Sequence, residues 1–162
     1  MDASEPDFQK IAYAVRVPQY EPVSSSGGVF TLLAERIMSD GGVVFGAAFD
    51  ESLKLRHVRI NDMSMLGCLR GSKYVQSDMN GVYRQVEDEL SESKKVLFSG
   101  TPCQVAGLKK FLGKDYPELL TLDLACHGVP SPEVWRRYVD EKGDGLVHVN
   151  FRDKSCGWRK YH

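Results

Sequence analysis

The clearest structural signal in the sequence is the segment Lys95-Val96-Leu97-Phe98-Ser99-Gly100-Thr101-Pro102-Cys103. Its first part is a short apolar run of the kind found in a strand that is buried on both faces. Gly100 then allows a turn, and Pro102 stands where the first turn of a helix accepts proline, because that position needs no N–H donor. The stretch therefore predicts a buried strand, a turn and a helix in direct succession.

Helices and strands alternate on both sides of this unit. Apolar residues recur at helical spacing in residues 29–38, which Gly41-Gly42 closes, and in residues 82–90. Ser131-Pro132-Glu133 is typical of a helix start, with an N-cap, a proline and an acid. We expect helices over residues 29–38, 62–69, 82–90, 102–113 and 134–141, and strands over residues 11–17, 43–49, 53–60, 95–99, 119–124 and 147–151.

The order of these elements predicts an α/β fold. Residues 43–49 and 53–60 are separated by Asp50-Glu51-Ser52, which indicates an antiparallel hairpin. The predicted architecture is a mixed, mostly parallel sheet flanked by helices, with this hairpin on one side. We expect residues 1–23 to form an N-terminal strand and linker, and residues 24–162 to form one domain. Because no capping element follows the last predicted strand, we expect this domain to be truncated at its carboxyl end, as the first part of a longer protein.

Composition and charge exclude several classes of protein. The chain of 162 residues is 42% hydrophobic and 27% charged, with a formal net charge of -1. A nucleic-acid binder normally carries a broad positive excess, so we expect none of that function here. The acidic start, Met1–Asp7, lacks the features of a secretory signal, which predicts a cytoplasmic protein. The most apolar run, Gly42–Phe49, is far shorter than the roughly 20 residues of a membrane-spanning helix.

The four cysteines are widely separated and form no CxxC pair. Disulfides do not persist in a reducing cytoplasm, so the thiols are either buried apolar side chains or ligands and nucleophiles brought together by the fold. Cys68 is expected in the core. Cys156 has no companion signal, and both tryptophans, Trp135 and Trp158, are expected to pack.

Two cysteine turns follow predicted sheet strands. Cys103 stands in the first turn of a helix, where the helix dipole and free amides favour the thiolate of a metal ligand or nucleophile, although a cysteine packed under the sheet is equally compatible. The turn Cys126-His127-Gly128-Val129-Pro130 follows the next strand, so both thiols could meet at one edge of the sheet. They could share a ligand role. A Cys103 and His127 hydrolase pair is a weaker alternative.

Two other loops offer small and polar residues to a ligand. The run Ser24-Ser25-Ser26-Gly27-Gly28 opens a helix, where backbone amides can approach a phosphate, or it is a flexible connector. The run Gly71-Ser72-Lys73-Tyr74 combines a turn, a hydroxyl, a cation and an aromatic ring. Such a set suits the phosphate and ring of a flavin nucleotide, and is also common on surfaces without ligands.

Taken together, four segments resemble the beta subunit of the coenzyme F-420 hydrogenase/dehydrogenase family. The likeness runs from about Ser24 to Trp158, and the Thr-Pro-Cys-Gln and Cys-His-Gly-Val-Pro pieces carry most of it. The segments are Ser25-Ser26-Gly27-Gly28-Val29-Phe30, Arg70-Gly71-Ser72-Lys73-Tyr74-Val75, Phe98-Ser99-Gly100-Thr101-Pro102-Cys103-Gln104-Val105-Ala106-Gly107-Leu108 and Cys126-His127-Gly128-Val129-Pro130-Ser131.

This resemblance implies a flavin and iron-sulfur oxidoreductase domain over residues 24–162. It implies FAD, a 4Fe-4S cluster, and hydride transfer between the flavin and a small redox substrate, which is coenzyme F-420 in archaeal members. It also implies a redox partner protein or ferredoxin-type domain. The residues implied to bind the flavin are Ser25, Ser26, Gly27, Gly28, Gly71, Ser72, Lys73, Tyr74, Gly100 and Thr101, and those implied to bind the cluster are Cys103 and Cys126.

The implied cluster lacks part of its ligand set in this sequence. Such clusters are held by four thiolates, and the resemblance assigns only Cys103 and Cys126 to that role. We therefore expect the chain by itself to be cluster-free. No general acid or base is identifiable, and a non-catalytic adaptor of the same fold remains the alternative from another functional class.

Overall fold

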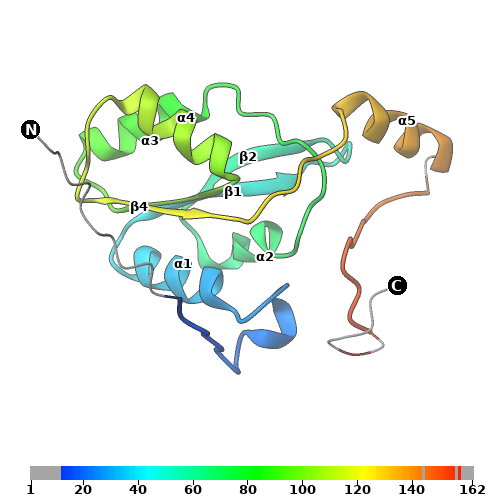
Figure 1. The fold of residues 1–162 in the computed structure, drawn as a ribbon, viewed down its shortest axis with the longest axis horizontal. Helices are drawn as coiled ribbons and strands as arrows, with labels where there is room; N and C mark the ends of the chain where they lie inside the picture. The colour runs from blue at the N-terminus through cyan, green and yellow to red at the C-terminus, as the bar shows by residue number, and fades with distance from the viewer. Residues whose placement is uncertain (1–11, 144, 156, 158–162) are drawn as a thin grey trace, which may run out of the picture.

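The computed structural model describes residues 12–143, 145–155 and 157, and a four-stranded sheet lies at its centre (Figure 1). The spatial order of the strands is β2-β1-β3-β4. β1 pairs with β3 and β3 with β4 in parallel, whereas β1 and β2 form the predicted antiparallel hairpin. The α/β class and the mixed, mostly parallel sheet are confirmed. The strands are β1 Val43–Phe49, β2 Leu55–Ile60, β3 Val96–Gly100 and β4 Leu119–Asp123.

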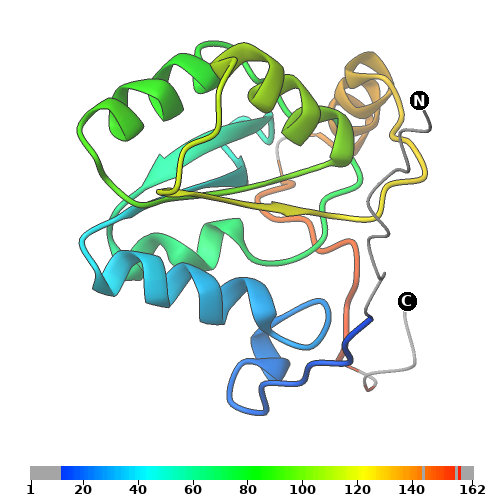
Figure 2. The same ribbon diagram turned by 60° about the vertical axis from the view of Figure 1, so that its left-hand side comes forward.

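The central strand β3 is buried along its whole length, as its apolar sequence predicts. Successive side chains of a strand point to opposite faces, so Val96 and Phe98 enter one core and Leu97 enters the other. The helices α3 (Val82–Ser91) and α4 (Pro102–Leu112) cover the first face. The helices α1 (Val29–Ser39) and α2 (Leu66–Leu69) cover the second. Figure 2 shows the resulting three layers edge on.

Local signals explain where the helices begin and end. Val82, Val86 and Leu90 recur every fourth residue and are the buried residues of α3. α4 begins with a capping box between Thr101 and Gln104 and ends at Gly113, whose φ of 68° suits glycine. The predicted helix over residues 62–69 divides into a 3-10 turn, Met63–Met65, and α2. A further 3-10 turn, Glu21–Val23, precedes α1.

The helix α5 (Pro132–Lys142) projects beyond the layered core, at the end of the hairpin (Figure 1). No residue of α5 is buried. The indole N–H of Trp135 donates to the carbonyl oxygen of Leu53 at 2.7 Å, and its ring stacks on Phe49 with centroids 5.6 Å apart. The expected packing of Trp135 is confirmed, whereas Trp158 lies outside the described residues.

Two predicted strands are wrong within the described residues. Residues 12–17 and 147–151 have no strand conformation, and Ile11 lies outside the described range. Alternating side chains favour an extended chain, but a strand also needs a neighbouring edge with which to pair. Tyr13, Val15 and Val147 are instead exposed. The second strand of the hairpin also begins later than predicted, at Leu55, because Leu53 lies in the turn with a φ of 56°.

None of the helices in the described part of the chain combines the length and hydropathy that crossing a bilayer requires.

Candidate functional site at the carboxyl edge of the sheet

The parallel strands β1, β3 and β4 end at one edge of the sheet, at Phe49, Gly100 and Asp123. The amide of Leu124 donates to the carbonyl oxygen of Gly100 at 3.0 Å, so the chain leaving β4 stays beside the turn that opens α4. In open α/β sheets, ligands bind outside the carboxyl ends of the strands. A ligand site is therefore expected at this edge.

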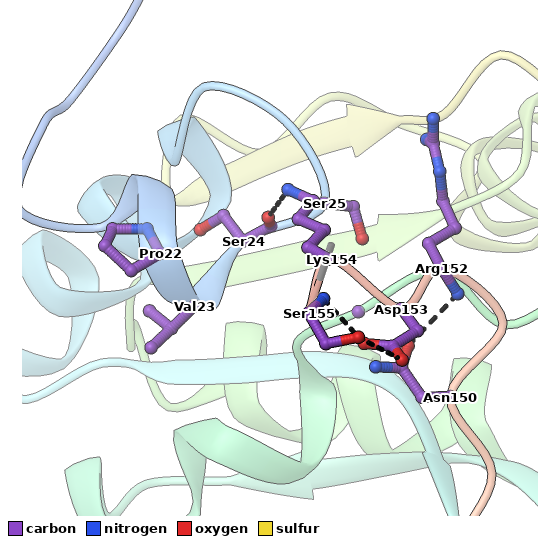
Figure 3. A pocket seen from close by; sticks show the side chains of 10 residues that line it. Pro22, Val23, Ser24, Ser25, Asn150, Arg152, Asp153, Lys154 and Ser155 are labelled. Atoms are coloured by element: carbon purple, nitrogen blue, oxygen red, sulfur yellow. Dashed lines mark hydrogen bonds between the residues drawn. The ribbon is translucent and has the colours of Figure 1, made fainter. Parts of the chain in front are cut away.

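Two neighbouring cavities share Val23, Gly71 and Asn150, and the second is lined by Phe49, the last residue of β1. Figure 3 shows the one of about 390 Å³, which is also lined by Pro22, Ser24, Ser25, Arg152, Asp153, Lys154 and Ser155. The second has about 360 Å³ and is also lined by Phe49, Asp50, Leu53, Gly67, Cys68, Arg70, Ser72, Lys73, Val147, His148 and Val149. Both volumes fall within the usual range for small-molecule sites, roughly 300–1,000 Å³.

The two loops predicted to bind the flavin lie together. The amide of Ser72 donates to the hydroxyl of Ser25 at 2.8 Å, and Gly71 lines both cavities. The ammonium group of Lys154 donates to the carbonyl oxygen of Ser24 (Figure 3). Arg70, next to this junction, donates through Nε to the hydroxyl of the buried Thr31 in the first turn of α1, at 3.2 Å.

Gly27 and Gly28 are packed rather than loose. A Cβ atom on Gly27 would lie 2.1 Å from the carbonyl oxygen of Val15, and one on Gly28 would lie 2.8 Å from Cβ of Tyr20. Gly28 also has a φ of 87°, which favours glycine at the N-cap of α1. These two residues therefore let the preceding segment cross the start of α1, which a flexible connector would not require.

Lys73 is a half-buried cation on the wall of the second cavity. Its ammonium group donates to the carbonyl oxygens of Arg70 at 2.8 Å and Gly71 at 3.3 Å. Burial lowers the pKa of Lys73 to about 8, against an opposing effect of Cys68. Partial burial of the Cys68 thiol likewise raises its pKa, and Lys73 opposes that shift. The amine can therefore change its charge within the physiological range of pH.

Cys68 does not lie in the core, so that prediction is wrong. Its side chain is exposed and lines the second cavity. α2 is a single turn whose buried residues are Leu66 and Leu69, and Cys68 falls on its other side. Tyr74 is exposed as well, with its ring edge-on to Phe151 at 5.7 Å between centroids.

Cys103 and Cys126 lie on the turns that follow the adjacent strands β3 and β4, and both are exposed. Their exposure contradicts the alternative of buried packing thiols. The sulfur of Cys103 lies 3.1 Å from the hydroxyl oxygen of Thr101, and the amide of Gly128 donates to the sulfur of Cys126 at 3.3 Å. Among the hydrogen bonds of the described residues, none joins Cys103 to His127, as a hydrolase pair would require.

The described residues contain no group of three or more His, Cys, Asp or Glu side chains that could hold a metal ion. The two thiols fit an iron-sulfur cluster in chemical type and in exposure, but they make up half of a four-thiolate set. Cys156, the remaining cysteine, lies outside the described residues.

His57 was missed by the sequence reasoning, although it lies behind the Cys103 turn. Its Nδ1 is 2.8 Å from the hydroxyl of Ser77, and its Nε2 is 2.9 Å from the carbonyl oxygen of Ser99. Gln104 donates to the same hydroxyl of Ser77 at 2.8 Å. Only the Thr-x-x-Gln pattern of the capping box signalled this arrangement in the sequence. The two contacts of His57 span 20 and 42 residues, beyond the reach of local patterns.

Comparison with known proteins bears on the cysteine turns most directly. Residues 93–161 match the family model for the carboxy-terminal part of the beta subunit of coenzyme F420 hydrogenase/dehydrogenase. This segment of the chain is therefore similar to that family. The matched segment contains Cys103 and Cys126, whereas the loops of Ser25 and Lys73 precede it. No curated protein matches the chain.

The fold also resembles a solved structure, a chain of the F420-reducing [NiFe] hydrogenase complex from Methanosarcina barkeri. The TM-score is 0.60 at 18% sequence identity, and the match covers 83% of this chain and 52% of the hydrogenase chain. The chain described here thus spans about half the length of that hydrogenase chain. At this identity the similarity shows a shared fold.

Proposed function

We propose that this chain is a flavin-dependent electron-transfer module of the beta-subunit type. The observation that carries the proposal is that Phe49, the last residue of β1, lines the second cavity, while the cysteine turns follow the parallel strands β3 and β4 at the same edge of the sheet. An electron carrier bound at Cys103 and Cys126 and a nucleotide bound near Lys73 would then both lie toward this edge of the sheet. The proposal includes cytoplasmic action on coenzyme F-420 or another small redox substrate.

The cavities suit the two halves of a dinucleotide. The one shown in Figure 3 is lined by Arg152 and Lys154, and the other by Arg70 and Lys73, so cations border both. Such cations, together with the amides and hydroxyls near Gly71, can bind a pyrophosphate between the halves. The residues that we propose for the flavin are Ser25, Ser26, Gly27, Gly28, Gly71, Ser72, Lys73, Tyr74, Gly100 and Thr101.

The cysteine turns would provide part of an iron-sulfur site. Cys103 and Cys126 are exposed and follow neighbouring strands, so a cluster could reach both, with the other ligands supplied by further residues or a partner. The bound flavin and cluster would supply hydride and single-electron chemistry, respectively. The chain's own residues would hold them, orient them and shield them from water. A redox partner protein or a ferredoxin-type domain would deliver or remove electrons.

A non-catalytic adaptor is the second candidate, because the described residues do not complete a metal-binding group. Such an adaptor would keep the fold without binding flavin or iron.

Anaerobic purification followed by FAD titration separates the two candidates. We expect quenching of flavin fluorescence on binding, and loss of bound iron in Cys103→Ser and Cys126→Ser when the protein is reconstituted with its redox partner. Cys68→Ser is the matched control for iron binding alone, because Cys68 is an exposed thiol of α2 and belongs to neither cysteine turn. Absence of flavin binding at saturating FAD would favour the adaptor. Equal iron loss in Cys68→Ser would contradict the assignment of the ligands.

A further inference from the structure

A chain of hydrogen bonds, each with an assigned donor and acceptor, links His57 to Ser77 and Gln104. The carbonyl oxygen of Ser99 can only accept, so Nε2 of His57 carries the proton in their 2.9 Å contact. Burial lowers the pKa of His57 although the contact with Ser99 opposes that shift, so the ring is neutral and its Nδ1 accepts from the hydroxyl of Ser77 at 2.8 Å. That hydroxyl in turn accepts from the side-chain amide of Gln104 at 2.8 Å.

The side chain of Gln104 links Ser77 to Thr101. Because its NH₂ group is bonded to Ser77, its Oε1 faces the amide of Thr101 and accepts from it at 2.9 Å. In the same capping box, the hydroxyl oxygen of Thr101 accepts from the backbone amide of Gln104. The O–H of Thr101 is then left to donate to the sulfur of Cys103, 3.1 Å away.

We propose that His57 is a positioning residue for Cys103, acting through Ser77, Gln104 and Thr101. His57 lies on β2, two strands away from the Cys103 turn, and its ring stacks on Phe98 with centroids 5.4 Å apart. The inference rests on the proposed function in one respect, which is the role of Cys103 as a cluster ligand. The coupling between His57 and the Cys103 thiol requires no bound cofactor, so it can be measured without flavin or iron.

Packing alone does not explain a histidine at this position. An apolar ring would stack on Phe98 equally well and would need no hydrogen-bond partners, whereas a buried imidazole must have both nitrogens satisfied. Here both nitrogens are satisfied, and the tautomer that they require fixes the direction of every later bond to Thr101. A fully satisfied buried network of this kind holds its members in one arrangement.

The test removes the middle of the network. In Ser77→Ala, Gln104 loses the bond that orients its amide, so we expect the amide hydrogen of Thr101 to exchange about tenfold faster, as expected when one hydrogen bond is lost. Ser77→Thr keeps a hydroxyl and should return the rate to near the wild-type value. NMR of reduced, cofactor-free protein labelled at cysteine Cβ should show the Cys103 resonance shifted in Ser77→Ala and the Cys126 resonance unchanged.

A second variant that interrupts the hydrogen-bond network and a matched control variant complete the test. His57→Phe keeps a ring against Phe98 but removes both nitrogens, and should reproduce the effects of Ser77→Ala. Ser91→Ala removes a hydroxyl at the end of α3 and should change neither Thr101 nor Cys103. Wild-type exchange and an unmoved Cys103 resonance in Ser77→Ala would overturn the proposal, as would equal shifts of Cys103 and Cys126. A failure of flavin or iron binding alone would overturn the proposed function and leave this coupling standing.

Discussion

The backbone amide of Ser72 donates to the hydroxyl of Ser25 at 2.8 Å, although 47 residues separate them in the sequence. This bond joins the turn before α1 to the loop after α2 on the wall of the two cavities. The two predicted flavin loops are therefore joined, and a change in one loop should alter the affinity for a ligand that the other loop binds.

Ser25→Ala should weaken FAD binding by about five- to tenfold. The change removes one hydrogen bond that orders the loop of Ser72, and such a bond contributes roughly 1 kcal/mol. Fluorescence titration measures the affinity, and Ser91→Ala is the control because its hydroxyl bonds to Glu87 in α3, away from the cavities. An unchanged affinity in Ser25→Ala would show that the junction does not support the ligand.

FAD affinity should fall as the pH rises through about 8. Burial lowers the pKa of Lys73 to about 8, so the amine loses its positive charge there and attracts phosphate less. A bound phosphate would itself favour the charged form and move the midpoint upward. Titrations between about pH 6.5 and 9.5 measure the effect. Lys73→Met should bind weakly with little dependence on pH, and Lys73→Arg should keep its affinity at high pH; the same pH profile in all three proteins would exclude Lys73.

The fold was predictable where the signals are local. The β3 strand, the turn at Gly100 and the start of α4 follow from an apolar run, a glycine and a proline in the first helical turn, which all act within a few residues. The strand predicted over residues 147–151 failed because alternation alone provides no partner edge. Cys68 was misplaced because its position depends on which side of one short turn faces β1.

The site was predictable only in part. The cysteine turns follow from the rule that parallel strands end at one edge, and the structure shows both thiols exposed there. The roles of Gly27 and Gly28 depend on residues that precede them, Val15 and Tyr20, which no ligand motif contains. His57 gave no signal, because Ser77 and Ser99 reach it through the tertiary fold.

The stability of the wild-type protein relative to Lys73→Met should rise as the pH increases from about 8 toward 10.5. In the folded state the pKa of Lys73 is lowered to about 8 from the ordinary 10.5, so in this window the unfolded chain binds more protons than the folded one. Stability rises with pH wherever that holds. Urea denaturation at several pH values measures the difference. A constant difference between the two proteins would mean that Lys73 titrates normally in the folded protein.

Asp50 should stabilise the hairpin at neutral pH and lose this effect in acid. Burial acts to raise its pKa, but hydrogen bonds from Ser52, Lys54 and Arg56 outweigh burial and lower the pKa to about 2. The contribution is complete above the unfolded pKa near 4 and disappears as the pH falls through about 2. Asp50→Ala should cost roughly 1–2 kcal/mol at pH 7, after allowance for partial exposure, and much less at pH 2.

The measurement is chemical denaturation of both proteins at pH 7 and across the acid range. Glu51→Ala is the matched control, because Glu51 is an exposed carboxyl in the same turn. An equal loss in Glu51→Ala, or a loss in Asp50→Ala that does not shrink in acid, would contradict the hydrogen-bonded turn.

Trp135→Ala should release α5 while leaving the layered core intact. α5 has no buried residue, and Trp135 joins it to the hairpin through the bond to Leu53 and the stack on Phe49. Losing most of an indole contact of this kind costs roughly 2–3 kcal/mol, enough to raise the open fraction of α5 by more than about tenfold. Amide exchange in residues 132–142 should accelerate accordingly, whereas β3, with every residue buried, should exchange as in the wild type. Trp135→Phe keeps a ring for the stack but loses the N–H donor, so its effect should be intermediate. If exchange in α5 is unchanged in Trp135→Ala, other contacts hold this helix against the hairpin.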